Sequence, residues 1–475
     1  MTTSSDLTRF ADDVRARASA GTWGTRSQAP VFVSRAPGRL DVMGGIADYS
    51  GALVLQWPIR EATRVALRRS ADRRLAIRSR RGDGSERHCD VPLDVVADAG
   101  RPYDEVRAWF AAEPERHWAA YVAGVFSVLA KEHGARFDDG AEILIESDVP
   151  EGKGVSSSAA LEAATMEAVV AAWGLEIEPK TRAVRCQQVE NLVVGAPCGI
   201  MDQMASICGE AGSLMELLCQ PAEFLGTVHL PAALGVWGID SGIRHAVTGA
   251  DYGAVRVGAF MGYRILADLA GLPVTPGARD GHVHVHDTRW HGYLANVGGE
   301  AFRRVEPELP VSLDGRTFLA RYGGTTDRVT QVDPRRTYAV RVPTAHPVFE
   351  HERVHEWARR LRAFNSDAPA ADAERLGALM FESHASYSAC GLGSDGTDRL
   401  VAMAREAGPA RGVYGAKITG GGSGGTVAFL ADASAGAVIR DMAAHYAAET
   451  GRDAYVFEGS SPGAARVGTE RLDLA

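Results

Sequence analysis

A loop of glycines and serines that joins a strand to a helix constrains the fold of this chain more than any other segment. The apolar run 141–146 predicts a strand, the alanine-rich run 157–173 predicts a helix, and the sequence PEGKGVSSSAA at 150–160 connects them. Its glycines can adopt a positive φ that turns backbone N–H groups toward a ligand, and its serines can supply an N-cap and hydroxyl donors. Such a helix entry is a natural phosphate cradle, and an ordinary capped helix is the alternative for the motif taken alone.

A second glycine-rich loop lies toward the C-terminus, in the sequence KITGGGSGGT at 417–426. Gly420, Gly422 and Gly425 match the dinucleotide-binding spacing G-x-G-x-x-G, but that fingerprint must open a helix. The residues that follow, 426–430, have the apolar pattern of a strand. We therefore reject the Rossmann interpretation and expect a loop that approaches a ligand closely, with a flexible turn as the alternative.

Carboxylates and an arginine complete the set of groups that can carry chemistry. Asp202 lies in CGIMDQ at 198–203, in the first turn of a predicted helix, where a mere partner of the helix dipole is the alternative. Glu190 lies on the preceding helix, and Arg39 and Asp48 lie in a turn-rich run near the N-terminus. Together with the glycine–serine loop they supply a backbone cradle, a Mg²⁺ ligand set, a cation and a carboxylate that orients or deprotonates an acceptor. These are the parts of phosphoryl transfer to a hydroxyl.

The order of the predicted elements favours an α+β fold of two domains. Strands and helices mix without the strict β-α-β alternation of a doubly wound parallel sheet. The segments 63–69 and 74–80 alternate apolar residues with arginine, and we expect them to pair as a hairpin with a solvated basic face. We place an N-terminal helical extension at 1–28, a first domain at 29–233 and a second domain at 234–475.

Composition excludes several classes of protein. The 475 residues are 45% apolar and 23% charged, as in ordinary globular chains, and the net charge of −9 argues against a nucleic-acid partner. The six cysteines include no C-x-x-C pair, which argues against zinc or dithiol chemistry. The start of the sequence has no signal-peptide pattern, and no apolar run approaches the length of a membrane helix. We therefore expect a cytoplasmic protein with no membrane partner; the sequence leaves the oligomeric state open.

The loop motifs resemble the three signature motifs of the GHMP small-molecule kinases. The run APGRLDVMGGIADYSG at 36–51 is similar to the first motif, and the loops at 150–160 and 417–426 are similar to the second and third. The segments 198–203 and 240–252 are similar to the galactokinase branch. Within that branch, runs such as RLDVMGGIADYSG and FEGSSPGA resemble most of all the kinases of L-arabinose. The resemblance covers all but the ends of the chain. It implies a ribosomal-S5-like N-terminal domain and a ferredoxin-like C-terminal domain with the active site between them, ATP as co-substrate and Mg²⁺ as cofactor.

The same resemblance implies roles for individual residues. Asp202 matches the catalytic carboxylate, and Arg39 matches the arginine that pairs with it. Ser158 and Glu190 match the positions that hold Mg²⁺. The residues implied to hold sugar hydroxyls are Asp48, Tyr252 and Asp202 itself. The residues implied to contact the nucleotide are Gly152, Lys153, Gly154, Val155, Ser156, Ser157, Ser158, Gly421, Gly422 and Trp118, and for Trp118 core packing is the alternative.

Two positions in the first motif depart from the galactokinase pattern G-E-H-x-D. Gly45 and Ile46 stand where galactokinases present a Glu and a His to the exocyclic CH₂OH group of the sugar. L-Arabinopyranose is galactopyranose without that group, so a carboxylate at this place would be buried without a partner, which costs several kcal/mol. An isoleucine facing the ring methylene removes that cost. Gly45 and Ile46 therefore belong to the predicted sugar-binding set.

The sequence predicts an ATP-dependent sugar 1-kinase that converts L-arabinose to β-L-arabinose 1-phosphate, with only small molecules as partners. The alternatives are a kinase of galactose, a uronic acid or another modified pentose, and a non-catalytic sugar or ATP sensor on the same fold. Two features stay without a settled role. Lys153 either adds a cation at the phosphates or points into solvent, and the alternating His282, His284 and His286 favour a polar strand face over a metal site.

Overall fold

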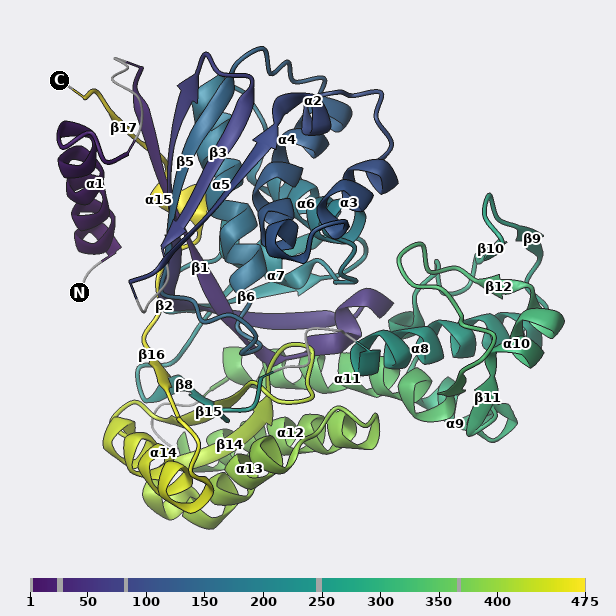
Figure 1. Ribbon diagram of the computed structural model, residues 1–475. Coiled ribbons are helices and arrows are strands. Elements are labelled where there is room, and N and C mark those ends of the chain that lie inside the picture. Colours follow the sequence, from purple (N-terminus) through teal and green to yellow (C-terminus); the bar gives the residue numbers. More distant parts are fainter. Residues whose placement is uncertain (1–2, 24–28, 81–83, 245–249, 365–368, 475) are drawn as a thin grey trace.

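The structure of the protein is a computed structural model. It describes residues 3–23, 29–80, 84–244, 250–364 and 369–474. Part of the 240–252 segment that carries the galactokinase resemblance lies outside these ranges. The chain forms two lobes, each built on its own sheet, and an extension that projects to one side of the second lobe (Figure 1).

The first lobe contains an eight-stranded sheet in which β2 is the longest strand. The strand order is β17-β1-β2-β5-β3-β4, and β6 and β7 continue the sheet from the other end of β2. The strands are β1 (Val31–Met43), β2 (Leu53–Ser70), β3 (Arg74–Arg80), β4 (Glu86–Pro92), β5 (Gly140–Ser147), β6 (Ser213–Leu218), β7 (Glu223–His229) and β17 (Glu470–Leu472).

Helices cover one face of this sheet, and the N-terminal helix α1 (Thr3–Ser19) lies against the other face (Figure 1). Helix α5 (Ser157–Trp173) follows the glycine–serine loop and is buried on nearly every side, because its many alanines let β1 and β2 pack closely against it. The other helices of this face are α2 (Leu93–Val96), α3 (Tyr103–Ala111), α4 (Ala120–His133), α6 (Pro179–Gln188), α7 (Met201–Cys208) and α15 (Ala464–Val467).

The second lobe is a four-stranded antiparallel sheet in the order β14-β15-β8-β16. Its strands are β8 (Leu234–Asp240), β14 (Val413–Ile418), β15 (Thr426–Asp432) and β16 (Val456–Glu458). Its helices are α11 (Arg341–Arg362), α12 (Pro369–Ala389), α13 (Asp395–Ala407) and α14 (Gly436–Thr450). Strand β15 directly follows the second glycine-rich loop, which agrees with the rejection of a dinucleotide fingerprint.

The extension contains a long helix and several short elements with an apolar cluster of their own. These are α8 (Ala250–Leu269), β9 (Val274–Pro276), β10 (Gly281–Val285), α9 (Gly299–Val305), β11 (Ser312–Asp314), α10 (Gly315–Tyr322), β12 (Gly324–Thr325) and β13 (Thr337–Ala339). The mixture of antiparallel sheets and packed helices confirms the α+β class. The predicted domain boundaries stay a prediction: β8 belongs to the second sheet, whereas β17 near the C-terminus returns to the first.

The predicted arginine hairpin is wrong in its pairing, and its solvated basic face is confirmed only for β3, where Arg74 and Arg78 are exposed. Strand β5 lies between β2 and β3, because β2 pairs with it antiparallel and β3 pairs with it in parallel. Arg64 and Arg68 are buried, opposite Glu146 and Glu142 in the β2–β5 register, and form ion pairs with them. Carboxylates on the neighbouring strand, and not water, therefore neutralise these two arginines.

A buried ion pair fixes the second lobe against the first. Lys417 on β14 pairs with Asp41 on β1, and both side chains are fully buried. The backbone N–H of Asp41 also donates to Thr419 Oγ1 at 2.6 Å. These contacts bring the end of β1 and the second glycine-rich loop together. Within the described ranges, no helix combines the length and the apolar character needed to cross a bilayer.

Candidate active site

A cavity of about 190 Å³ lies where the two glycine-rich loops, the first turn of α7 and the turn after β1 meet. The predicted site residues that line it are Arg39, Ile46, Asp48, Gly152, Gly154, Ser156, Ser157, Ser158, Glu190, Asp202, Tyr252 and Gly421. The remaining lining residues are Pro197, Cys198, Gly199, Met201 and Gly420. The structure thus brings together groups that are far apart in the sequence.

Both carboxylate oxygens of Asp202 are held by hydrogen bonds. Arg39 on β1 places Nε and Nη2 at 2.9 and 2.7 Å from Asp202 Oδ1. Arg39 Nη1 also donates to the carbonyl oxygen of Gly154 at 2.6 Å, and Ser156 Oγ donates to Asp202 Oδ2 at 2.6 Å. Charge-assisted bonds of this kind are short and directional. They fix the orientation of the carboxylate in the cavity.

Ser156 does not cap the helix as the sequence pattern predicts. It occupies the N-cap position of α5 with a φ of 61°, and its side chain makes no capping hydrogen bond. The left-handed backbone turns its hydroxyl toward Asp202 instead. No pattern in the sequence indicates this contact, because the two residues lie in separate motifs.

The loop before α5 has the positive φ angles expected of its glycines. These angles are 74° at Gly152 and 70° at Gly154. A Cβ atom on Gly154 would lie 3.0 Å from the carbonyl oxygen of Thr419, at the start of the second glycine-rich loop. Thr426 Oγ1 donates to the carbonyl oxygen of Lys153 at 2.8 Å, which ties the two loops together. A side chain at residue 154 would therefore be strained by the positive φ and would push against the second glycine-rich loop.

Two residues of the first loop lie away from the cavity. Lys153 Nζ lies 2.7 Å from Asp240 Oδ2 at the end of β8, so the ammonium is neither at the cavity nor pointing into solvent. Val155 is fully buried in an apolar cluster. The Lys153–Asp240 pair therefore joins the first loop to the second lobe.

Glu190 lies in a π-helical turn, Val189–Val194, that continues α6. Ser158 hydrogen-bonds its carboxylate, and Gln203 Nε2 donates to Glu190 Oε2 at 2.8 Å. Burial and the negative charge of Asp202 raise the pKa of Glu190 to about 7. Gln203 also reaches the buried Glu162 at 3.3 Å, so it links two carboxylates that the sequence motif alone does not connect.

Asp48 presents an unsatisfied oxygen inside the protein. The side chain is buried, and Oδ1 has no hydrogen-bond partner. Burial and the nearby charge of Asp202 raise the pKa of Asp48 to about 7. A buried acceptor without a partner is costly, so this oxygen marks a place for a ligand donor. Tyr252 lines the same cavity, and Arg256, which the motifs do not single out, is held nearby by Asp327 at 2.8 Å.

Gly45 and Ile46 occupy different environments. A Cβ on Gly45 would lie 1.5 Å from the hydroxyl oxygen of Tyr387, so no side chain fits at this position while Tyr387 stays in place. The same hydroxyl accepts the backbone N–H of Ile46 at 2.8 Å. Ile46 is buried in a small apolar cluster and also lines the cavity, whereas Gly45 does not line it.

Three further predictions fall outside the cavity. The guanidinium carbon of Arg87 lies 4.3 Å from the ring centroid of Trp118. Gly422 packs against Leu392. His282 and His284 line a separate cavity in the extension. Among the described residues, no group of three His, Cys, Asp or Glu side chains is arranged to hold a metal ion.

Comparison with known proteins places this site in a family. The family models described as GHMP kinases N terminal domain and GHMP kinases C terminal match residues 120–210 and 364–448, and the galactokinase galactose-binding signature matches residues 23–69. A galactokinase of Chloroflexus aggregans is 30% identical over 427 residues, which cover 89% of this chain and 90% of that relative. The chain belongs to the GHMP kinase family.

Two other likenesses refine the place of this GHMP kinase. An L-arabinokinase of Arabidopsis thaliana is 44% identical over 93% of the chain, and the chain spans about half of that relative, with 47% of its length covered. The galactokinase of Lactococcus lactis, solved in complex with galactose, superposes with a TM-score of 0.69 at 20% identity over 93% of this chain and 95% of that one. The structural likeness confirms the two-domain GHMP kinase fold.

Proposed function

We propose that this GHMP kinase transfers a phosphoryl group from ATP to the anomeric hydroxyl of L-arabinose, giving β-L-arabinose 1-phosphate and ADP. The observation that carries the proposal is the Arg39–Asp202–Ser156 arrangement, which opens on one cavity with the unpartnered oxygen of Asp48. The identity to the Arabidopsis L-arabinokinase along most of the chain supports the choice of sugar.

Asp202 is the proposed catalytic carboxylate. Held by Arg39 on one oxygen and by Ser156 on the other, it keeps one orientation toward the cavity. A carboxylate in this position can accept the proton of the attacking sugar hydroxyl, a contribution of about 10²–10⁴-fold in rate for general base catalysis. Arg39 also contacts the Gly154 carbonyl, so the proposed acid–base group and the phosphate loop are fixed to each other.

The loops are proposed to hold the nucleotide. Residues 152–158 precede and begin α5, where the helix dipole favours anions, so their backbone N–H groups are the proposed donors to the phosphates. Gly421 of the second glycine-rich loop also lines the candidate active site, and the next residue, Gly422, packs against Leu392. Trp118 stays a proposed neighbour of the adenine, with Arg87 stacked on its ring.

Ser158 and Glu190 fit a magnesium ion. Mg²⁺ prefers oxygen ligands and usually keeps several waters, so one carboxylate and one hydroxyl beside substrate phosphates suit it better than a full protein cage. Both residues line the cavity, and the hydrogen bond between their side chains holds the two oxygens close together. When bound, the ion supplies positive charge to the phosphates of ATP.

The surroundings of Gly45 favour a sugar without an exocyclic hydroxymethyl group. The galactokinase resemblance puts a carboxylate at this position, but here the hydroxyl of Tyr387 fills the space that its Cβ would need. Gly45 does not line the candidate site, but the next residue, Ile46, supplies an apolar wall to it. Asp48 and Tyr252 remain to contact hydroxyls that L-arabinose and D-galactose share. The candidate site thus lacks a carboxylate that could bind the exocyclic hydroxymethyl group and keeps the proposed partners of the ring hydroxyls.

An assay of ADP release on a panel of sugars tests the proposal. We expect L-arabinose to be phosphorylated with a kcat/KM at least about tenfold above that of D-galactose, since one misfit group is worth about 1–3 kcal/mol. Equal or better use of galactose or a uronic acid would contradict the arabinose assignment. Binding of sugar and ATP without any ADP release would indicate the sensor alternative.

The Ile46→Ala variant tests the apolar wall. Removing the side chain should make room for a hydroxymethyl group, so the arabinose-to-galactose ratio of kcat/KM should fall, mainly because galactose is used better. Ile418→Ala is the matched control, because Ile418 belongs to the same buried cluster and does not line the cavity. Both variants should lose about 2–5 kcal/mol of stability, but only Ile46→Ala should change sugar preference. The same change in preference in both variants would contradict the role of Ile46.

The raised pKa of Asp48 predicts that the Asp48→Asn substitution stabilises the protein more at high pH than at low pH. The folded-state pKa of about 7 lies above the unfolded value of about 4, so the native state binds the proton more tightly. The aspartate therefore costs stability progressively as pH rises from about 4 to about 7. The difference in Tm between Asp48→Asn and wild type should therefore be more positive at pH 8 than at pH 5. The exposed Asp441→Asn should show no such trend, and a pH-independent difference for Asp48→Asn would contradict the raised pKa.

A further inference from the structure

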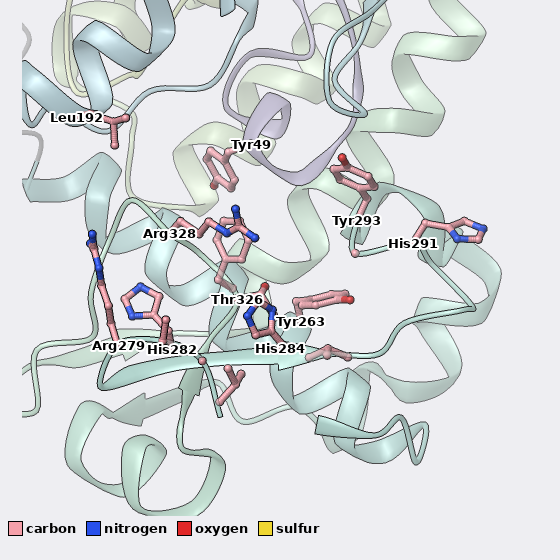
Figure 2. A pocket seen from close by; sticks show the side chains of 16 residues that line it. Tyr49, Leu192, Tyr263, Arg279, His282, His284, His291, Tyr293, Thr326 and Arg328 are labelled. Carbon is pink, nitrogen blue, oxygen red and sulfur yellow. The ribbon is translucent and has the colours of Figure 1, made fainter. Parts of the chain in front are cut away.

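The extension contains a cavity that the proposed reaction does not use. Its volume is about 700 Å³, against about 190 Å³ for the candidate active site. Tyr49 and Leu192 of the first lobe close it on one side, and α8, β10 and neighbouring loops of the extension form the rest (Figure 2). A cavity of this size is in the range that holds small ligands.

Positive charge lines this cavity without a negative partner. Arg279 and Arg328 both line it, and neither makes an ion pair or side-chain hydrogen bond within the part of the chain that is described. None of the lining residues is an Asp or a Glu. Asp327 binds Arg256, and Asp287 accepts the hydroxyl of Tyr263 at 2.7 Å. Asp280, which follows Arg279 in the chain, is exposed and does not line the cavity. Both arginines are exposed, and their two unpaired guanidinium groups border the same cavity.

Aromatic rings line the other side of the cavity. Figure 2 shows Arg279 on one side, Tyr263 and Tyr293 on the other, and Arg328 and Tyr49 between them. Guanidinium groups bind phosphate oxygens with two parallel hydrogen bonds, and tyrosine rings offer flat apolar faces with a polar tip. The combination suits a ligand with a phosphate at one end and a ring at the other.

We propose that this cavity binds a small phosphorylated molecule with a ring body, which is the shared chemistry of a nucleotide and a sugar phosphate. The phosphate lies between Arg279 and Arg328, and the ring lies against Tyr293, which is partly exposed, whereas Tyr263 is buried. Tyr49 follows Asp48 in the chain, and its ring packs at 5.8 Å from that of Tyr252. The second site is thus separated from the candidate sugar site by a layer of aromatic side chains.

Calorimetric titration of the whole chain tests this proposal with three probes: uridine monophosphate, galactose 1-phosphate and inorganic phosphate. We expect one of the two ring-bearing probes to bind, and to bind more tightly than inorganic phosphate. The tighter of the two identifies the ligand as a nucleotide or a sugar phosphate. The Arg279→Gln/Arg328→Gln double variant should weaken that binding at least about tenfold, as expected for losing charged hydrogen bonds to phosphate. Arg335→Gln, an exposed arginine of the extension outside the cavity, is the control and should bind as wild type does.

Titration of the Gly154→Val variant separates the two cavities, because the substitution alters the glycine-rich loop of the candidate active site and leaves the extension unchanged. Binding at the second site should persist in this variant, whereas binding that disappears belongs to the candidate active site and overturns the proposal. Unchanged affinity in the double variant, or no binding of any probe up to about 10 mM, also overturns it. Because no turnover is measured, these outcomes do not depend on the proposed kinase activity.

Discussion

The Asp202→Asn variant is expected to lose about 10²–10⁴-fold in kcat, the usual contribution of a general base. Asparagine keeps the shape of the side chain and can still accept a hydrogen bond from Arg39, but it cannot take the proton of the sugar hydroxyl. Affinity for the sugar should be largely kept. Steady-state kinetics with saturating L-arabinose and ATP measure the first quantity, and calorimetry with the sugar alone measures the second.

A partial loss would assign Asp202 a different role. If the variant keeps more than about a third of the wild-type kcat, Asp202 does not act on the reacting hydroxyl in the rate-limiting transition state. Ser156→Ala provides a companion measurement, because it removes one hydrogen bond to the carboxylate and leaves the carboxylate in place. It should lower kcat by less than Asp202→Asn does.

The Gly154→Val variant is expected to raise the KM for ATP strongly with the fold intact. A valine at a φ of 70° is strained, and its Cβ would lie 3.0 Å from the Thr419 carbonyl oxygen, so the two glycine-rich loops would have to separate. Residues 152–158 are the proposed phosphate cradle, so this shift should displace the groups that hold the phosphates of ATP. Kinetics at varied ATP concentration, supported by nucleotide calorimetry, measure the effect.

Gly271→Val is the matched control for Gly154→Val. Gly271 has a φ of 68°, and nothing lies within 4 Å of an added Cβ, so the variant carries the same backbone strain without blocking a loop. It should lose stability and keep the wild-type KM for ATP. Unchanged ATP binding by a folded Gly154→Val variant would contradict the assignment of residues 152–158 as the phosphate cradle.

Local sequence patterns were sufficient to predict the helices and strands that carry the candidate site residues. The helix predicted at 157–173 matches α5, and the predicted helix that carries Glu190 is divided into α6 and a π-helical turn. The strand after the second glycine-rich loop was also predicted correctly, because loop glycines and apolar runs are short-range signals. These elements bring most of the motif residues to one cavity.

Contacts between distant segments could not be read from the same patterns. The burial of Arg64 follows from the insertion of β5 beside β2, which depends on strand order and not on the alternation within β2. The Lys153–Asp240 pair and the Ser156–Asp202 hydrogen bond each join two separate segments. Tyr387, which fills the space beside Gly45, lies in no recognised motif. Tertiary geometry alone shows what these residues do.

Phosphorus and proton NMR of the product would show which hydroxyl of the sugar receives the phosphoryl group. The enzyme would be incubated with L-arabinose, ATP and Mg²⁺, and the position of the new phosphate would be read from its coupling to the sugar protons. The account predicts a phosphate coupled to the anomeric proton of β-L-arabinopyranose, formed together with ADP. A phosphate on any other hydroxyl, or no phosphorylated arabinose from an enzyme that phosphorylates galactose, would contradict it.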